Sequence, residues 1–395
     1  MRKILKNNLI IIAVVAIAVV LVGISGLRQQ VNKNNMFSHV VAEAENLIEG
    51  YYYDEALKLV DDAGYSQEKT AEIREKIKTE KSKLREYDGQ VYHVFFHSLI
   101  VYPELAFDGD YMQEGYDMWM TTVSEFKAML PQLYERDFIL VNLTDIKKGE
   151  KLLLPERKKP LIISIDDVNY YDYMENDGFA DRLVVDEKGN VATEVKNLNG
   201  EYEVTYDGDV MPILDKFVEE HPDFSYRGAK GIVAVTGYEG AFGYNFIKEE
   251  DEDRKSELKA KATDVAKAFK NTGWLIACHS YTHNDYFRDG GVSNEDLHYD
   301  TNRFKERIYE VVLSPDIYIS PFGYHLNEGD ERLMYLKNMG YNFFCPVSPA
   351  MRTFFTEEDV LISERFNLDR YNMRTKKDYI NQVFFDVDSV YYTIK

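Results

Sequence analysis

Residues 161–169 read LIISIDDVN, and this short stretch predicts both the fold class and the position of a functional site. A short apolar run of this kind, bounded by polar residues, is typical of a strand buried on both faces of a parallel sheet. The run ends at two adjacent carboxylates, Asp166 and Asp167. Ligands bind outside the carboxyl ends of strands in parallel α/β folds, so this position favours function, and an ordinary capping or turn pair is the alternative.

Short apolar runs alternate with helical patterns over residues 89–395, which predicts an α/β domain with parallel strands and crossover helices. Residues 174–210 break the alternation, because the turn sequences KGN and LNGE separate β-like runs there, and they are expected to form a β insertion. The other β-like runs are VYHVFFHSLIV (91–101), FILVNL (138–143), GIVAV (231–235), WLIAC (274–278), DIYISP (316–321) and YNFFCPV (341–347).

The amino-terminal region predicts a membrane anchor. Residues 9–27 are 19 consecutive uncharged and mostly apolar residues, close to the roughly 20 that a helix needs to cross a bilayer. Arg2, Lys3 and Lys6 precede them, so the positive-inside rule leaves the amino terminus in the cytoplasm and the rest outside. A cleaved signal peptide is the alternative, but the apolar core is longer than usual and no clear A-x-A site follows. Residues 1–30 are therefore expected to form a single-pass anchor in the cell membrane.

Residues 31–88 carry a helical pattern that predicts a hairpin stalk between the anchor and the α/β domain. Apolar residues recur at spacings of three and four, Gly64 is placed to end one helix, and Ser66 is placed to cap the next. Such a stalk could contact another protein.

Charge and cysteine content exclude several classes of protein. The formal net charge is −21, and a surface of that sign repels phosphate backbones, so nucleic acid is not expected as a partner. The 2 cysteines, Cys278 and Cys345, exclude a disulfide framework and a Cys-rich zinc site. Each cysteine ends an apolar stretch, which favours two small buried side chains over a single disulfide.

A second strand-like run, WLIAC, is followed by HSYTH, in which His279 and His283 are four positions apart. That spacing brings two imidazoles to one face of a helical turn and suits a metal ion. Metalloproteases place Glu after the first histidine as the base, whereas Ser280 stands here, so a protease is disfavoured. Two imidazoles and one carboxylate form a triad that holds Zn²⁺ or another divalent metal, and the spare aspartate can act as a base.

A third motif, YISPFGY at residues 318–324, completes a resemblance to a known family. In order, SIDDV, HSYTH and SPFGY resemble the leading motifs of the polysaccharide deacetylases, the NodB-homology carbohydrate esterases of family 4. The runs VFFHSLI, MPILDKF, GIVAVTG and LKNMGY also match that family's layout, especially its branch of surface-polysaccharide N-deacetylases. The resemblance covers roughly residues 90–350 and implies a distorted (β/α) barrel.

The resemblance implies a role for each matching residue. Asp166 would be the general base that acts on water, and Asp167, His279 and His283 would hold one divalent metal ion. Zn²⁺ is the expected metal, with Co²⁺, Mn²⁺, Ni²⁺ and Fe²⁺ as alternatives. The backbone amide of Phe322 would help to bind the tetrahedral oxyanion.

Two departures from the family concern the base and the proton donor. Ile319 and Ser320 stand where the family often carries an Arg that orients the catalytic aspartate. No histidine occurs after His325, although many members donate the leaving-group proton from a late Leu-x-His motif. Within QVFFDVDSV, Asp386 or Asp388 would follow a strand, and Asp386 is the candidate acid.

Substrate contacts are predicted from aromatic and histidine residues near the motifs. Tyr170, in the tyrosine cluster after the aspartates, could stack on a sugar ring, and Tyr324 lies in the third motif. His97, in VFFHSLI, matches the leading Tyr-His of the branch and could line the cleft. Core packing is the alternative for the tyrosines.

Together these features predict an extracellular, membrane-anchored deacetylase that removes N-acetyl groups from an amino-sugar polymer. Peptidoglycan and a poly-N-acetylglucosamine-type surface polysaccharide are the two expected substrates. A catalytically weak or inactive carbohydrate-binding module on the same fold is one alternative, motivated by the missing Arg and His. An O-acetyl esterase is the other.

Overall fold

The structure is a computed structural model that describes residues 35–394. The predicted transmembrane segment at residues 9–27 lies outside this range. Within the described range, no helix has both the length and the apolar character needed to cross a membrane. The chain divides into two compact units at Lys83 and Leu84.

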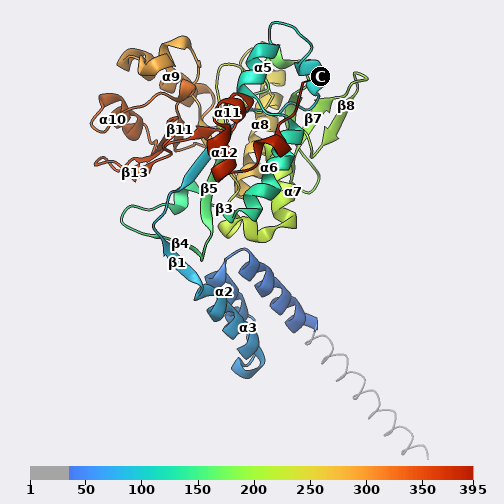
Figure 1. Cartoon of the computed structure of the whole chain (residues 1–395), viewed down its shortest axis with the longest axis vertical. Coiled ribbons are helices and arrows are strands. Elements are labelled where there is room, and N and C mark those ends of the chain that lie inside the picture. Colours follow the sequence, from blue (N-terminus) through green and yellow to red (C-terminus); the bar gives the residue numbers. More distant parts are fainter. Residues whose placement is uncertain (1–34, 395) are drawn as a thin grey trace, which may run out of the picture. The chain divides into compact units, whose positions relative to one another are not determined.

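The first unit contains three described helices, one more than the predicted hairpin. They cover residues 35–49, α2 (Tyr53–Asp62) and α3 (Gln67–Lys81) (Figure 1). Ser66 caps α3 as predicted, because its side chain accepts a hydrogen bond from the Lys69 amide.

The second unit begins earlier than the predicted boundary at residue 88. Residues Leu84–Tyr87 form β1, which pairs antiparallel with β4 (Leu152–Pro155). Because β4 leads directly into the central sheet, this pairing makes β1 part of the second unit.

A ten-stranded sheet forms the centre of the second unit, in the order β13-β14-β12-β11-β10-β9-β5-β2-β15, with β3 also paired to β5. All pairings are parallel except that of β13 with β14. The strands are β2 (Tyr92–Phe96), β3 (Phe138–Leu140), β5 (Lys159–Ile165), β9 (Ile232–Val235), β10 (Leu275–Cys278), β11 (Ile317–Ile319), β12 (Phe343–Cys345), β13 (Thr353–Phe355), β14 (Leu361–Ser363) and β15 (Phe366–Asn367).

The two ends of the parallel sheet meet at one short segment. Only Glu364 and Arg365 separate β14 from β15, yet β14 pairs with β12 and β15 pairs with β2. The sheet must therefore curl so that its ends approach each other, which agrees with the predicted distorted barrel.

Helices surround the curled sheet. In Figure 1, α9 and α10 lie on the same side as β11 and β13, whereas α6 and α7 lie towards β7 and β8. The helices are α4 (Pro103–Ala106), α5 (Gln113–Trp119), α6 (Val123–Glu135), α7 (Val210–Glu220), α8 (Glu252–Thr272), α9 (Asn294–Arg307), α10 (Glu331–Asn338), α11 (Arg370–Thr375), α12 (Lys377–Val383) and α13 (Val387–Val390).

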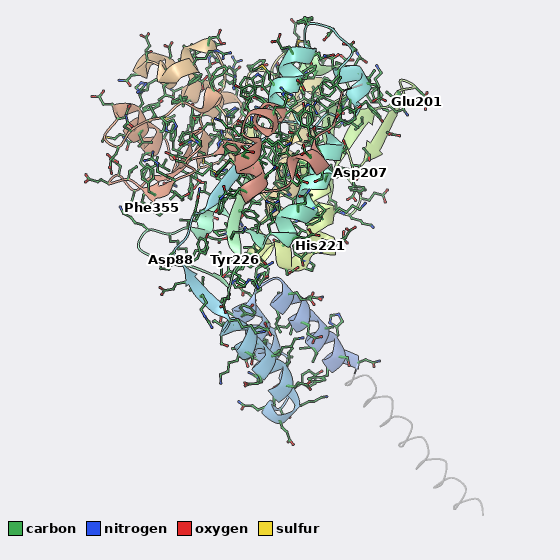
Figure 2. The ribbon with its side chains drawn as sticks, viewed as in Figure 1. Asp88, Glu201, Asp207, His221, Tyr226 and Phe355 are labelled. Carbon is green, nitrogen blue, oxygen red and sulfur yellow. The ribbon has the colours of Figure 1, made fainter. Side chains whose placement is uncertain are left out.

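The predicted β insertion at residues 174–210 contains a separate three-stranded antiparallel sheet. Its strands are β6 (Ala180–Val185), β7 (Val191–Lys196) and β8 (Tyr202–Thr205), joined by turns at the KGN and LNGE sequences. Glu201 and Asp207, labelled in Figure 2, flank β8.

The two cysteines are free and buried, as predicted. Cys278 ends β10 and Cys345 ends β12, and β11 lies between these strands. The intervening strand keeps the two sulfur atoms from pairing.

Candidate active site and metal centre

A cavity of about 700 Å³ lies at the carboxyl ends of the parallel strands. Asp166 and Asp167 reach it from the end of β5, and His279 and His283 reach it from the loop after β10. This is the edge of the sheet where parallel α/β folds place their ligands. The structure therefore brings the first two sequence motifs together in one cavity.

Asp167, His279 and His283 form a candidate metal-binding triad. One ligand atom from each residue lies within 4.8 Å of the other two. Within residues 35–394, no other group of three His, Cys, Asp or Glu side chains converges in this way. Two imidazole nitrogens and one carboxylate oxygen are suitable ligands for Zn²⁺ and for other first-row divalent metals.

The hydrogen bonds around the triad leave the ligand atoms available. The Nδ1 atom of His279 lies 2.9 Å from the carbonyl of Ile319, so this nitrogen donates and Nε2 keeps its lone pair. Asp167 accepts hydrogen bonds at Oδ1 from Tyr171 (2.5 Å) and Thr236 (2.7 Å). Its Oδ2 atom is 4.0 Å from Nε2 of His283. These hydrogen bonds orient the side chains of His279 and Asp167 toward one point, so the residues fit a bound metal ion.

The loop that carries the histidines is not the helical turn that the sequence predicted. It has no helical assignment, and both Ser280 (φ 69°) and His283 (φ 48°) adopt left-handed backbone conformations. Asp167 does the same, with φ of 56°. Such conformations cost on the order of 1–3 kcal/mol each in non-glycine residues. They persist because the surrounding structure holds them.

Asp300, on α9, holds this loop. Its carboxylate accepts hydrogen bonds from the backbone amides of Tyr281 (2.8 Å) and Thr282 (2.7 Å), and from the hydroxyl of Thr282 (2.7 Å). The side chain of Asp300 is fully buried. One carboxylate thus fixes the chain between the two histidine ligands, a role that the sequence did not indicate.

For two members of the triad, Asp167 and His279, electrostatics favour the protonation states that metal binding needs. Burial alone would raise the pKa of Asp167, but the neighbouring charges of His283, His279 and His97 lower it below its usual value. Burial lowers the pKa of His279, which favours the neutral imidazole. The carboxylate is therefore ionised and the histidine neutral near pH 7.

Asp166 forms a buried ion pair that the sequence did not predict. Arg365, in the segment that joins β14 to β15, donates a hydrogen bond of 2.7 Å to Oδ1 of Asp166. The guanidinium is also held by the carbonyl of Cys345 (3.2 Å) and the hydroxyl of Ser164 (3.2 Å). Burial would raise the pKa of Asp166, but Arg365 and His279 lower it. Arg365 thus takes the place of the arginine that is missing from the third motif.

Two further predicted residues, His97 and Phe322, also line the cavity. His97 Nδ1 lies 3.1 Å from the carbonyl of Trp119, so Nε2 remains available. Phe322 has a left-handed backbone (φ 54°), and its ring centre lies 4.4 Å from that of His283. Both residues therefore border the metal triad.

Three predictions of site residues are corrected by the structure. Tyr170 is buried and donates a 2.5 Å hydrogen bond to Asp209, outside the residues that line the cavity. Tyr324 is also buried and stacks on Phe287. Asp386 is exposed at the start of α13 and does not reach the cavity. The apolar run before Asp386 begins at the end of α12 and continues into a turn, and it forms no strand.

Two other tyrosines of the same cluster, Tyr171 and Tyr173, contact site residues or line the cavity. Tyr171 binds Asp167, and the ring of Tyr173 stacks on that of Tyr171 with centroids 5.3 Å apart. Tyr173 and Trp119 both line the cavity and are each 49% exposed. Trp119 carried no recognisable signal in the sequence, because it ends a short helix far from the motifs.

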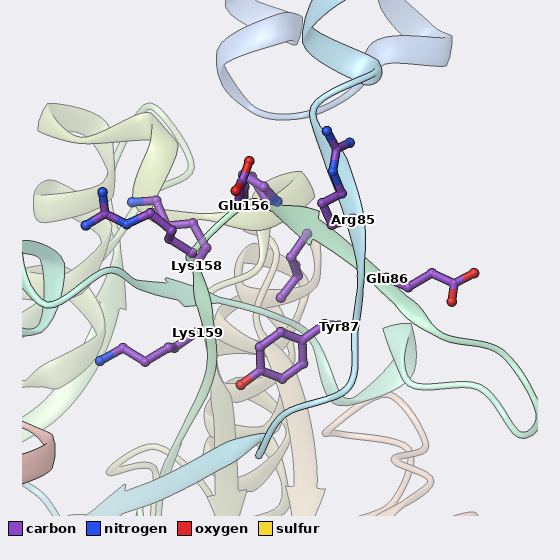
Figure 3. Close-up of a pocket in the computed structure, with 9 residues that line it drawn as sticks. Arg85, Glu86, Tyr87, Glu156, Lys158 and Lys159 are labelled. Atoms are coloured by element: carbon purple, nitrogen blue, oxygen red, sulfur yellow. The ribbon is translucent and has the colours of Figure 1, made fainter.

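A smaller cavity of about 180 Å³ lies at the other end of β5 (Figure 3). Side chains of β1, including Arg85, Glu86 and Tyr87, line one side. Residues at the start of β5, including Lys158 and Lys159, line the other. Its walls carry both signs of charge and contain no histidine, so they do not suggest a catalytic or metal site.

No protein-family model matches the chain, and a search of curated proteins also gives no match. Among solved structures, it is similar to the deacetylase PplD from Streptococcus pyogenes in complex with acetate, with 11% identity and a TM-score of 0.40 over 73% of this chain and 97% of PplD. It is also similar to IcaB from Ammonifex degensii, with 10% identity and a TM-score of 0.40 over 73% of this chain and 96% of IcaB. A third similar structure is the BpsB deacetylase domain from Bordetella bronchiseptica, with 10% identity and a TM-score of 0.36 over 72% of this chain and 98% of that domain. Likeness at this level assigns no function, so the chemistry rests on the residues of the site.

Proposed function

We propose that the protein is a metal-dependent deacetylase that hydrolyses N-acetyl groups of an amino-sugar polymer. One observation carries this proposal: Asp166, paired with buried Arg365, lies beside a triad of Asp167, His279 and His283 that is suited to a metal. Amide hydrolysis needs an activated water, a polarised carbonyl and a proton for the leaving amine. When bound, a divalent metal ion polarises the carbonyl and acidifies water.

Asp166 is placed to accept the proton of the attacking water. Its Oδ1 atom is occupied by Arg365, and its Oδ2 atom lies 3.9 Å from Nε2 of His279, a ligand in the triad. Arg365 keeps the carboxylate ionised and fixes its orientation, which are the two conditions for a general base.

His97 replaces Asp386 as the proposed proton donor. Its Nδ1–H donates to the carbonyl of Trp119, so Nε2 protonates the leaving amine from the imidazolium form, in which both ring nitrogens carry a proton. His97 lines the same cavity as Asp166 and Asp167. The backbone amide of Phe322, at the same cavity, is the proposed donor to the oxyanion.

A sugar polymer fits the walls of the cavity. Trp119 and Tyr173 present half-exposed aromatic rings beside the metal triad, and such rings stack on the apolar faces of sugars. We further propose that residues 1–30 anchor the enzyme in the cell membrane, that residues 31–83 form a stalk, and that the second unit acts outside the cell. An anchored enzyme suits an insoluble polymer such as peptidoglycan or poly-N-acetylglucosamine.

The test measures acetate release by the full chain from N-acetylglucosamine oligomers, with Zn²⁺, Co²⁺, Mn²⁺, Ni²⁺ and Fe²⁺ added separately. We expect release with at least one metal, and a loss of at least about 100-fold in Asp166→Asn. Asp378→Asn, at an exposed position on α12, is the matched control.

The alternatives give different outcomes in the same assay. Bound metal and bound oligomer without acetate release would show a carbohydrate-binding module. Release from acetyl esters of sugars, without release from the N-acetyl oligomers, would show an O-acetyl esterase.

A further inference from the structure

The carboxyl end of α5 meets the proposed site at two points. Trp119 is the last residue of α5 and lines the large cavity. Its carbonyl accepts the hydrogen bond from Nδ1 of His97. The last carbonyls of a helix have no partner within that helix, so this oxygen is free to bind the ring. The end of α5 therefore contacts the proposed proton donor and also presents an aromatic ring to the cavity.

Helix α5 depends on contacts outside itself to keep this position. It has 7 residues, and isolated helices shorter than about 12–15 residues are marginal in water. Tyr116 is buried and donates a 2.7 Å hydrogen bond to Asp177. The next residue, Asp117, forms a second set of contacts.

Asp117 pairs with two arginines of α11. Its Oδ1 atom lies 2.8 Å from Nε of Arg370, and its Oδ2 atom lies 2.8 Å from Nη1 of Arg374. Arg374 also donates a 3.1 Å hydrogen bond to the carbonyl of Asp117. The side chain of Arg370 is buried, and those of Asp117 and Arg374 are 26% and 36% exposed. Water and salt screen partly buried pairs less than exposed ones, so this ion-pair cluster can hold the end of α5.

Backbone contacts on the far side of Trp119 join the same two elements. The amide of Arg370 donates to the carbonyl of Met120 (3.4 Å), and the hydroxyl of Thr121 donates to the carbonyl of Leu368 (3.3 Å). Helices α5 and α11 accordingly lie side by side (Figure 1). Trp119 is thus held between the ion-pair cluster and these backbone contacts.

Arg370 keeps other partners when Asp117 is replaced. It pairs with Glu125 on α6 and donates a 3.0 Å hydrogen bond to the hydroxyl of Tyr391. An uncompensated buried charge would be strongly destabilising. Because these two contacts remain, a substitution at Asp117 releases α5 without leaving Arg370 unpaired.

We propose that Asp117 is a positioning residue. Held by Arg370 and Arg374, it fixes the end of α5, and through the carbonyl of Trp119 it orients His97. The inference rests on the proposed function, in which His97 protonates the leaving amine, and it identifies what aligns that donor. The three members of the ion-pair cluster are not among the residues that line the cavity, so they act through Trp119.

The first test measures the position of Trp119 without turnover. Acrylamide quenches the fluorescence of exposed tryptophans, and Trp119 is 49% exposed whereas the other tryptophan, Trp274, is buried. Asp117→Ala in the full chain removes both ion pairs of α5, and alanine favours a helix. Glu114→Ala, at an exposed position of the same helix, is the matched control. We expect a higher quenching constant in Asp117→Ala and the wild-type constant in the control.

The second test separates alignment of the proton donor from general damage. With metal bound, Asp117→Ala should lower kcat on N-acetylglucosamine oligomers by about tenfold or more, because proton transfer is sensitive to small misplacements. Hydrolysis of nitrophenyl acetate should fall much less, since its leaving group needs no proton. Arg374→Gln leaves Asp117 paired with Arg370, and it should change the quenching constant and the ratio of the two rates in the same direction by a smaller factor.

A wild-type quenching constant in Asp117→Ala, or equal losses on the amide and ester substrates, would overturn the positioning role. If Asp117→Ala does not fold, wild-type values of both quantities in Arg374→Gln would overturn it. The proposed function fails by a different result, namely no acetate release by the wild type with any of the metals. The quenching test still decides whether Asp117 holds Trp119 in that case.

Discussion

Arg365 donates a 2.7 Å hydrogen bond to Asp166, although 199 positions separate the two residues in the chain. The contact exists because Arg365 follows β14, at the segment where the two ends of the sheet meet. Both side chains are buried, so neither charge is compensated by water. The pair therefore links the closure of the sheet to the ionisation of Asp166, the proposed base.

Replacing Arg365 should lower both stability and activity. Arg365→Gln leaves Asp166 buried and unpaired, which we expect to cost about 3–5 kcal/mol of unfolding free energy. The pKa of Asp166 should rise, so the acidic limb of the rate profile should move to higher pH, since the base must be ionised. Urea unfolding and kcat/KM from pH 4 to 9 measure the two effects.

Arg157→Gln is the matched control for Arg365. Arg157 also pairs with a carboxylate, that of Asp137, but the two side chains are 80% and 40% exposed. Exposed pairs contribute about 1 kcal/mol or less. An equal shift of the acidic limb in both variants would show that Arg365 does not control the pKa of Asp166.

Metal binding should depend on the triad of Asp167, His279 and His283. We expect one divalent ion per chain in the wild type. His283→Ala should lose most of the bound metal, because only two of the three protein ligands remain. Metal should also raise the melting temperature of the wild type and not that of the variant. His298→Ala is the control, since His298 is exposed on α9 and stacks on Tyr335. Equal metal content in both variants would exclude the triad as the metal site.

The hydrogen bonds that Asp300 accepts from the loop of the histidines should strengthen metal binding. Asp300→Ala removes three hydrogen bonds from the loop between His279 and His283. Lost outer contacts of this kind usually weaken metal binding by about 10–100-fold. Competition with a coloured chelator measures the affinity, and Glu295→Ala on the same helix is the control. Unchanged affinity would mean that the loop holds its shape without Asp300.

A comparison of two substrates with different leaving groups should identify the proton donor. An amine must be protonated as it leaves, whereas a nitrophenolate does not need a proton. His97→Gln should therefore lower kcat on N-acetyl oligomers by about 100-fold or more, but lower the hydrolysis of nitrophenyl acetate much less. A parallel loss on both substrates would show that His97 acts in another way.

Asp369 should make the stability depend on pH. Burial raises its pKa from 3.8 to about 7 in the folded chain, so the folded state binds this proton more tightly than the unfolded state. This stabilisation is complete below about pH 4 and is lost as the pH rises through about 7. The wild type should therefore lose stability relative to Asp369→Asn between pH 4 and 7. Urea unfolding of both chains across this range measures the difference, and a constant difference would contradict the raised pKa.

Local sequence determined several features by itself. The apolar run LIISI predicts a buried parallel strand, and the polar residues at its end lie in the cavity, because strand ends in such folds always reach one edge of the sheet. The four-residue spacing of His279 and His283 brings both to the metal site, although through a strained loop and not a helical turn. The turn sequences around β7 likewise mark the inserted sheet.

Tertiary structure alone decided which side chains complete the site. Arg365, Asp300 and Trp119 lie outside the motifs in sequence. Arg365 binds Asp166, Asp300 binds the loop of the histidines and Trp119 lines the cavity, because the sheet curls and the helices pack around it. Tyr170 follows the first motif and Tyr324 lies in the third, but both side chains are buried in the core and do not line the cavity. A sequence pattern reports the period and the ends of an element, whereas contacts between distant elements depend on how the whole chain closes. For this protein, the sequence predicted the residues of the candidate metal triad and the proposed base, and the fold supplied the arginine that binds the proposed base.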